Sequence, residues 1–80
     1  MSKLMEILKD TRPENDFENS TNFLEDDFLD SLDIVTVLSE IEDICGIEID
    51  YADIAETDFE TEETILGLVT RSGGDAALLR

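Results

Sequence analysis

Apolar residues along most of the chain recur at the three- and four-residue spacing of a helix that buries one face. The longest run lies within residues 31–45, and its apolar positions are Ile34, Val37, Leu38, Ile41, Ile44 and Cys45. Residues with this spacing share one side of an α-helix, and the glycine that follows at position 46 is a frequent helix stop. The pattern therefore predicts an amphipathic helix over residues 31–45 with these side chains in the core.

Two shorter helices are predicted near the ends of the chain. Residues 2–11 have apolar side chains at helical spacing, and Pro13 must end this helix because proline cannot donate a backbone hydrogen bond. Thr61 can cap a last helix whose first turn contains two glutamates, which the helix dipole favours. The inward positions of that helix are Ile65, Leu66, Leu68 and Val69. After Asp50, a weaker pattern predicts one or two helical turns within residues 51–56, so the fold is expected to be all-α.

A long polar connection over residues 13–30 joins the first two predicted helices. Its apolar residues are Phe17, Phe23, Leu24, Phe28 and Leu29. Loops of this length are usually functional or disordered, and the apolar anchors favour an ordered loop over the core. Eighty residues provide one modest core and little volume for a deep cleft. We therefore expect one domain over residues 1–71 and a flexible tail over residues 72–80, in which Ala76–Leu79 adds little.

The charge of the chain is strongly negative and unevenly distributed. The formal net charge is −17, and the five basic residues are Lys3, Lys9, Arg12, Arg71 and Arg80. Residues 13–70 thus contain acids and no base. Such a surface repels nucleic acids and anionic lipids, and it attracts basic protein surfaces or divalent cations. We therefore expect no nucleic acid or membrane as partner. Because no D-x-D-x-D-G loop occurs, we expect only weak binding of divalent cations.

The sequence contains one cysteine, no histidine and no apolar stretch as long as a membrane span. A lone cysteine cannot form an internal disulfide, so a cytoplasmic protein is expected. Cys45 lies on the apolar face and is interpreted as a buried small hydrophobe. The absence of histidine removes the commonest general base and metal ligand, and most nucleophilic and zinc chemistry is thereby excluded.

The start of the predicted helix at residue 31 contains more capping residues than a helix requires. Asp30 is suited to the N-cap, Asp33 to the reciprocal position of a capping box, and Leu29 and Ile34 to a hydrophobic staple. Ser31 is left facing solvent without a structural role. The positive end of a helix favours an anion, so a phosphate ester could be attached there. Serine is nevertheless common in first turns, and position alone favours that simpler interpretation.

The wider sequence changes this interpretation. F-L-E-D at residues 23–26, three further residues, D-S-L-D at residues 30–33 and the amphipathic helix that follows closely resemble the acyl carrier protein family. The resemblance extends over about residues 3–70. It implies a four-helix bundle with a short third helix and a long first loop.

The resemblance also implies a function. In that family the serine of D-S-L carries 4′-phosphopantetheine, which assigns this covalent cofactor to Ser31 within a motif that includes Asp30, Leu32 and Asp33. A phosphopantetheinyl transferase attaches the arm, whose thiol then holds an acyl intermediate as a thioester. Separate enzymes of fatty acid or polyketide biosynthesis load, modify and transfer the acyl group. The protein itself is expected to be a non-catalytic carrier.

Some residues depart from the pattern of fatty-acid carriers. Phe28 stands where those proteins commonly have glycine, and the segment at residues 58–61 is more similar to stand-alone carriers of secondary pathways and to D-alanyl carriers. An aminoacyl carrier of the D-alanyl type therefore remains an alternative. A non-covalent acidic adaptor built on the same helices is a second one.

A second stripe on the predicted helix 31–45 lies beside the core stripe and starts next to the serine. Its residues are Leu32, Asp33, Val35, Thr36, Ser39, Glu42 and Asp43. Apolar residues ringed by acids are typical of a docking patch for partners with basic surfaces, although Thr36 and Ser39 fit a solvated flank equally well. We expect a monomer that presents this stripe to the transferase and to acyl-handling enzymes.

Overall fold

The computed structural model describes residues 2–80, and every regular element in this range is helical, with no strand. Three α-helices are present: α1 (Lys3–Thr11), α2 (Ser31–Cys45) and α3 (Glu62–Arg71). Four short 3₁₀ helices lie between and after them: η1 (Phe17–Asn19), η2 (Tyr51–Asp53), η3 (Glu56–Phe59) and η4 (Ala76–Leu79). The all-α class and the three long helical segments are thus confirmed.

The expected four-helix bundle is not found, because the described residues form three α-helices and the predicted short third helix is replaced by η2 and η3. Aspartate caps explain the difference. Asp50 accepts a hydrogen bond from the Ala52 N–H at 2.9 Å, and Asp58 accepts one from the Ala55 N–H at 2.9 Å. Asp50 is the N-cap of η2, whereas Asp58 is the third residue of η3 and bonds back to its N-cap, Ala55. Each short turn is therefore closed separately, and the backbone at Ile54 and Ala55 between them is extended.

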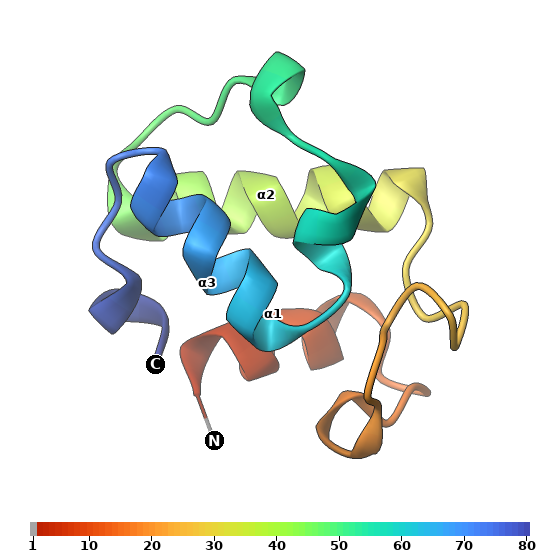
Figure 1. Ribbon diagram of the computed structural model, residues 1–80. Coiled ribbons are helices and arrows are strands. Elements are labelled where there is room, and N and C mark those ends of the chain that lie inside the picture. The colour runs from red at the N-terminus through yellow and green to blue at the C-terminus, as the bar shows by residue number, and fades with distance from the viewer. Residues whose placement is uncertain (1) are drawn as a thin grey trace.

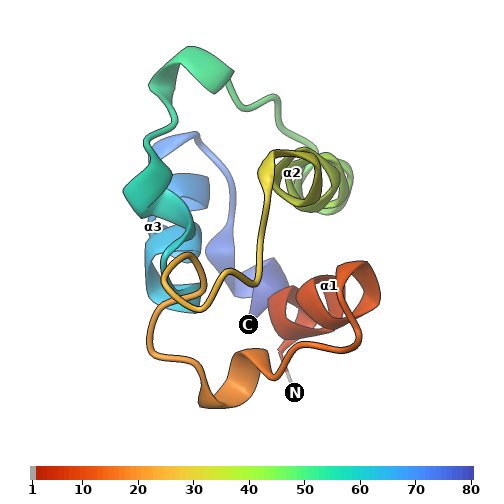
Figure 2. The ribbon, with the colours of Figure 1, turned by 90° about the vertical axis from the view of Figure 1, so that its right-hand side faces the viewer.

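The three helices enclose the core from different sides (Figures 1 and 2). Figure 1 shows α2 crossing the molecule, and Figure 2, which looks nearly along α2, shows α1 below it and α3 on the opposite side. The fully buried aliphatic side chains of the helices are Leu4, Leu8, Val37, Leu38, Ile41, Ile65, Leu68 and Val69. The predicted core face of α2 is thereby confirmed, with Ile34, Ile44 and Cys45 partly buried at its margin.

Aromatic residues fix the long first loop in place. Phe17 packs edge-on against Phe23 and Phe28, with ring centroids 5.2 and 5.3 Å apart. The Phe23 N–H also donates to the Glu60 carbonyl at 2.7 Å, which ties the loop to the short link between η3 and α3. The expected ordering of this loop is confirmed, and it delivers the chain to the start of α2 in a defined path.

The C-terminal segment returns to the helices, and the expectation that Ala76–Leu79 adds little to the core is wrong. Leu79 is fully buried, and η4 contacts all three α-helices. The turn that allows this return requires Gly74, because a Cβ there would lie 2.7 Å from Val69 Cγ1 and 2.8 Å from Ile47 Cδ1. Asp75 then starts η4 by accepting the Ala77 N–H at 3.0 Å.

Replacing Leu79 by alanine tests this packing. Leu79→Ala should lower the free energy of unfolding by about 2 to 4 kcal/mol, since it deletes a fully buried aliphatic side chain. The neighbouring Leu78 is 50% exposed, so Leu78→Ala should cost less than about 0.5 kcal/mol. Urea denaturation of both variants measures the difference, and equal losses would show that the segment does not contribute to the core.

Candidate functional site

The first turn of α2 is closed by two reciprocal hydrogen bonds. The Asp33 N–H donates to Asp30 Oδ1 at 2.9 Å, and the Asp30 N–H donates to Asp33 Oδ2 at 3.1 Å. This arrangement is a capping box built from two aspartates, as the sequence predicts. It satisfies backbone donors at the helix start without help from Ser31.

A basic side chain that the sequence analysis did not single out completes this turn. Arg12, the residue that ends α1, donates from Nε to Asp33 Oδ2 at 2.7 Å and from Nη2 to Asp30 Oδ2 at 3.0 Å. The hydrogen bond from the Asp33 N–H lowers the pKa of Asp30, and the charge of Arg12 adds to the shift against the opposing effect of burial. The hydrogen bond and charge of Asp33 in turn raise the pKa of Arg12. The carboxylates of Asp30 and Asp33 are therefore both paired with Arg12.

Ser31 is the first residue of α2, and its side chain is exposed. Within residues 2–80 no hydrogen bond involves its hydroxyl, whereas the side chains of Asp30 and Asp33 are both hydrogen-bonded. The hydroxyl is open to solvent at the positive end of a 15-residue helix. This combination permits covalent modification by an anionic group at low cost to the fold.

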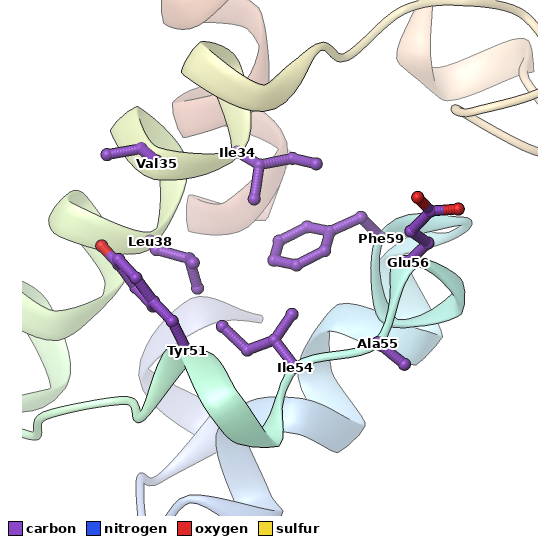
Figure 3. Close-up of a pocket in the computed structure, with 8 residues that line it drawn as sticks. All are labelled: Ile34, Val35, Leu38, Tyr51, Ile54, Ala55, Glu56 and Phe59. Carbon is purple, nitrogen blue, oxygen red and sulfur yellow. The ribbon is translucent and has the colours of Figure 1, made fainter.

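An apolar cavity of about 200 Å³ lies close to Ser31, which the sequence analysis did not anticipate. Its lining residues are Ile34, Val35, Leu38, Tyr51, Ile54, Ala55, Glu56 and Phe59. Figure 3 shows the ring of Phe59 and the side chains of Ile34, Leu38 and Ile54 directed into the space between α2 and the 51–59 segment. A second hollow includes Ser31 and shares Ile34 and Glu56 with the cavity, so the two adjoin.

The predicted docking stripe is only partly on the surface. Its exposed residues are Leu32, Val35, Thr36, Ser39 and Asp43, and Leu32 and Val35 are 77% and 47% exposed. Asp33, by contrast, is 8% exposed and paired with Arg12. Glu42 is half-buried and accepts the Ile49 N–H at 2.9 Å, which ties down the chain after α2. Two of the acids assigned to the stripe therefore serve the fold and do not face solvent freely.

Cys45 is partly buried at the end of α2, with its Sγ 4.0 Å from the Asp75 carbonyl oxygen. Burial raises the pKa of this thiol, and the negative charge of Asp75 raises it further. A thiol with a raised pKa is a weak nucleophile at neutral pH. Cys45 is thus poorly suited to hold a thioester, in agreement with its assignment as a small hydrophobe.

Comparison with protein families identifies the class of protein to which these features belong. A model of the family described as the phosphopantetheine attachment site matches residues 2–71, which is most of the chain. The chain therefore belongs to this family of carrier proteins, and the resemblance noted from its motifs is confirmed. Searches among curated proteins and among solved structures found no significant match.

Membership of this family establishes the type of cofactor. The domain is the site for covalent attachment of 4′-phosphopantetheine, and such domains are generally non-catalytic carriers that interact with partner enzymes. Within residues 2–80, no helix has the length and apolar character needed to cross a membrane.

Proposed function

We propose that Ser31 carries the 4′-phosphopantetheine arm and that the arm holds an acyl intermediate as a thioester for partner enzymes. The observation that carries this proposal is an exposed hydroxyl that has no hydrogen-bond partner among residues 2–80, at the start of a helix already capped by Asp30 and Asp33. We assign the carrier domain to residues 1–71, in keeping with the matched span, and treat residues 72–80 as an extension packed onto it.

The attachment reaction uses this hydroxyl as the nucleophile. The Ser31 Oγ attacks the β-phosphorus of coenzyme A, a new phosphoester bond forms, and 3′,5′-adenosine diphosphate leaves while the hydroxyl proton passes to a base of the transferase. The positive end of α2 favours the resulting phosphodiester. When bound, the arm supplies an accessible thiol, which the chain itself lacks because its Cys45 is partly buried and has a raised pKa.

The cavity beside Ser31 favours an acyl cargo over the aminoacyl alternative. Its walls are aliphatic and aromatic apart from the Tyr51 hydroxyl and the Glu56 carboxylate. An alkyl chain can enter such a space with a gain from burial, whereas a D-alanyl ammonium would lose its hydration there. A carrier for aminoacyl groups has no evident use for this apolar space, so it is the second candidate.

The exposed part of α2 is proposed as the surface that meets the transferase and acyl-handling enzymes. Leu32 and Val35 supply apolar contacts next to Ser31, and Asp43 lies farther along the exposed side of the helix. Thr36 and Ser39 complete this stripe. Basic patches on partners would be attracted by the negative surface and would then dock on the leucine and valine.

The first test is the attachment itself. After incubation with coenzyme A and a phosphopantetheinyl transferase, the wild-type protein should gain the mass of one arm, because it offers one suitable hydroxyl. Ser31→Ala should gain none, while Ser72→Ala, which removes a serine at the end of α3, should gain one. Intact-protein mass spectrometry measures all three. An unmodified wild type would support the non-covalent adaptor, and modification of Ser31→Ala would exclude this serine as the site.

The second test concerns cargo. Loading the arm with a hexanoyl group should shift the NMR signals of Ile54 and Phe59, since these side chains point into the cavity, and loading it with D-alanine should not. Ile54→Asp should remove the hexanoyl effect by making the cavity polar. If the hexanoyl group leaves the signals of Ile54 and Phe59 unshifted, as D-alanine should, the result favours the aminoacyl alternative or a cargo that stays in solvent.

The third test concerns docking. Leu32→Ala should slow arm attachment at every salt concentration, because it removes a 77% exposed apolar contact. Asp43→Lys should slow it mainly at low salt, where electrostatic steering is strongest. Glu63→Lys makes the same charge reversal on α3 and should have a smaller effect. If Leu32→Ala and Asp43→Lys are both modified at the wild-type rate in low salt, α2 is not the recognition surface.

A further inference from the structure

We propose that Arg12 is a positioning residue for arm attachment: it holds the first turn of α2 closed so that Ser31 is presented to the transferase in one geometry. This inference rests on the proposal that Ser31 is the attachment site. It assigns a role to a residue on a different helix, far outside the D-S-L motif.

The first observation is the geometry of the guanidinium. Arg12 reaches from the end of α1 and forms ion pairs with Asp33 at 2.7 Å, with Asp30 at 3.0 Å and with Glu14 at 3.7 Å. Asp30 precedes Ser31 and Asp33 follows it by two positions, so one side chain holds both ends of the turn. Arginine suits this task because its planar fork can donate to two carboxylates at once.

The second observation is the burial of Asp33. This carboxylate is 8% exposed, and its Oδ2 accepts both the Arg12 Nε–H and the Asp30 N–H. A carboxylate so placed is costly to keep ionised without a nearby cation. No base occurs within residues 13–70, and the charges of Lys9 and Arg71 are paired with Glu18 and Asp58. Arg12 therefore supplies the countercharge on which the capping box depends.

Removing that charge should open the turn. Each of the two aspartate side chains accepts the backbone N–H of the other, so the capping box holds the two carboxylates close together. Without Arg12, their negative charges repel each other. The Asp33 carboxylate would then turn toward water, the capping box would break, and Ser31 would lie on a frayed turn. The transferase would have to order this turn before the Ser31 hydroxyl could attack coenzyme A, which lowers the rate of attachment within the bound complex.

The same change makes the surface around Ser31 more negative. A partner with a basic patch should therefore bind the variant at least as well as the wild type. These two effects act on different kinetic constants. Poor positioning of Ser31 lowers kcat, whereas stronger attraction of a basic partner leaves KM unchanged or lowers it. A general loss of stability would give no such separation.

The fold provides a matched control in the pair formed by Arg71 and Asp58. Arg71 Nη2 donates to Asp58 Oδ2 at 3.0 Å, and the same oxygen accepts the Ala55 N–H at 2.9 Å. Asp58 is 9% exposed, close to the value for Asp33. Arg71→Gln thus removes an equivalent countercharge from η3 without touching the first turn of α2.

The experiment compares kcat and KM for arm attachment by a phosphopantetheinyl transferase in wild type, Arg12→Gln, Arg12→Lys and Arg71→Gln. Circular dichroism first sets a temperature at which all four are folded. We expect Arg12→Gln to lower kcat by about fivefold or more with KM unchanged or lower, and Arg12→Lys to recover part of the loss. Arg71→Gln should stay within about twofold of wild type. Amide hydrogen exchange of Asp33 and Ile34 should accelerate in Arg12→Gln and not in Arg71→Gln.

A second variant separates positioning from the loss of a charge in general. Asp33→Asn keeps the shape of the side chain but needs no countercharge, so adding Arg12→Gln to it should lower kcat much less than Arg12→Gln does in wild type. The proposal is overturned if Arg12→Gln has the wild-type kcat, if Arg71→Gln slows attachment equally, or if the two substitutions at Arg12 and Asp33 act additively. A wild type that accepts no arm would instead refute the proposed function, and this outcome is visible without any variant.

Discussion

The structure of this protein depends on countercharges for two buried carboxylates, in a chain with only five basic residues. Asp33 and Asp58 are both nearly buried, and each accepts a backbone N–H that starts a helical turn. All five basic residues lie outside residues 13–70, so the countercharges must come from outside this segment. Arg12 and Arg71 supply them from the ends of α1 and α3. Burial tends to raise the pKa of Asp58, but the hydrogen bonds from Arg71 and Ala55 and the arginine charge together lower it.

The first of these pairs reaches the turn of Ser31, and the second holds a neighbouring segment. Arg12 joins α1 to the turn that begins with the residue before Ser31, and Arg71 joins α3 to η3 on the other side of the hollow beside that serine. Most of the remaining acids are exposed, which leaves a negative surface suited to basic proteins. A chain with this composition can therefore be both well ordered at the modification site and strongly attractive to partners around it.

The 3₁₀ turns after α2 matter for the cavity. Asp50 caps η2, and Asp58 within η3 bonds back to the N-cap Ala55, so each is a single turn, and the backbone at Ile54 and Ala55 remains extended between them. Within residues 51–59 of the connection from α2 to α3, Ile54 and Phe59 turn inward (Figure 3). These side chains and those of Ile34 and Leu38 line an apolar pocket that is open to solvent. Irregular structure at this place creates volume that the helix pattern did not predict.

The amino-acid sequence by itself determined the local features of this protein. Helix α2 begins at Ser31 and ends at Cys45 as its apolar spacing predicts, and the Asp30–Asp33 capping box follows from residues three positions apart. The F-L-E-D and D-S-L-D segments, together with the amphipathic helix that follows, also indicated the family. Only the tertiary structure decided which acids are free, because Arg12 and Asp33 are 21 positions apart and Glu42 turns to the Ile49 N–H. It likewise decided that Leu79 is buried and that a cavity adjoins Ser31. Such contacts depend on how distant segments pack, and periodicity and capping rules describe only the order of residues within one segment.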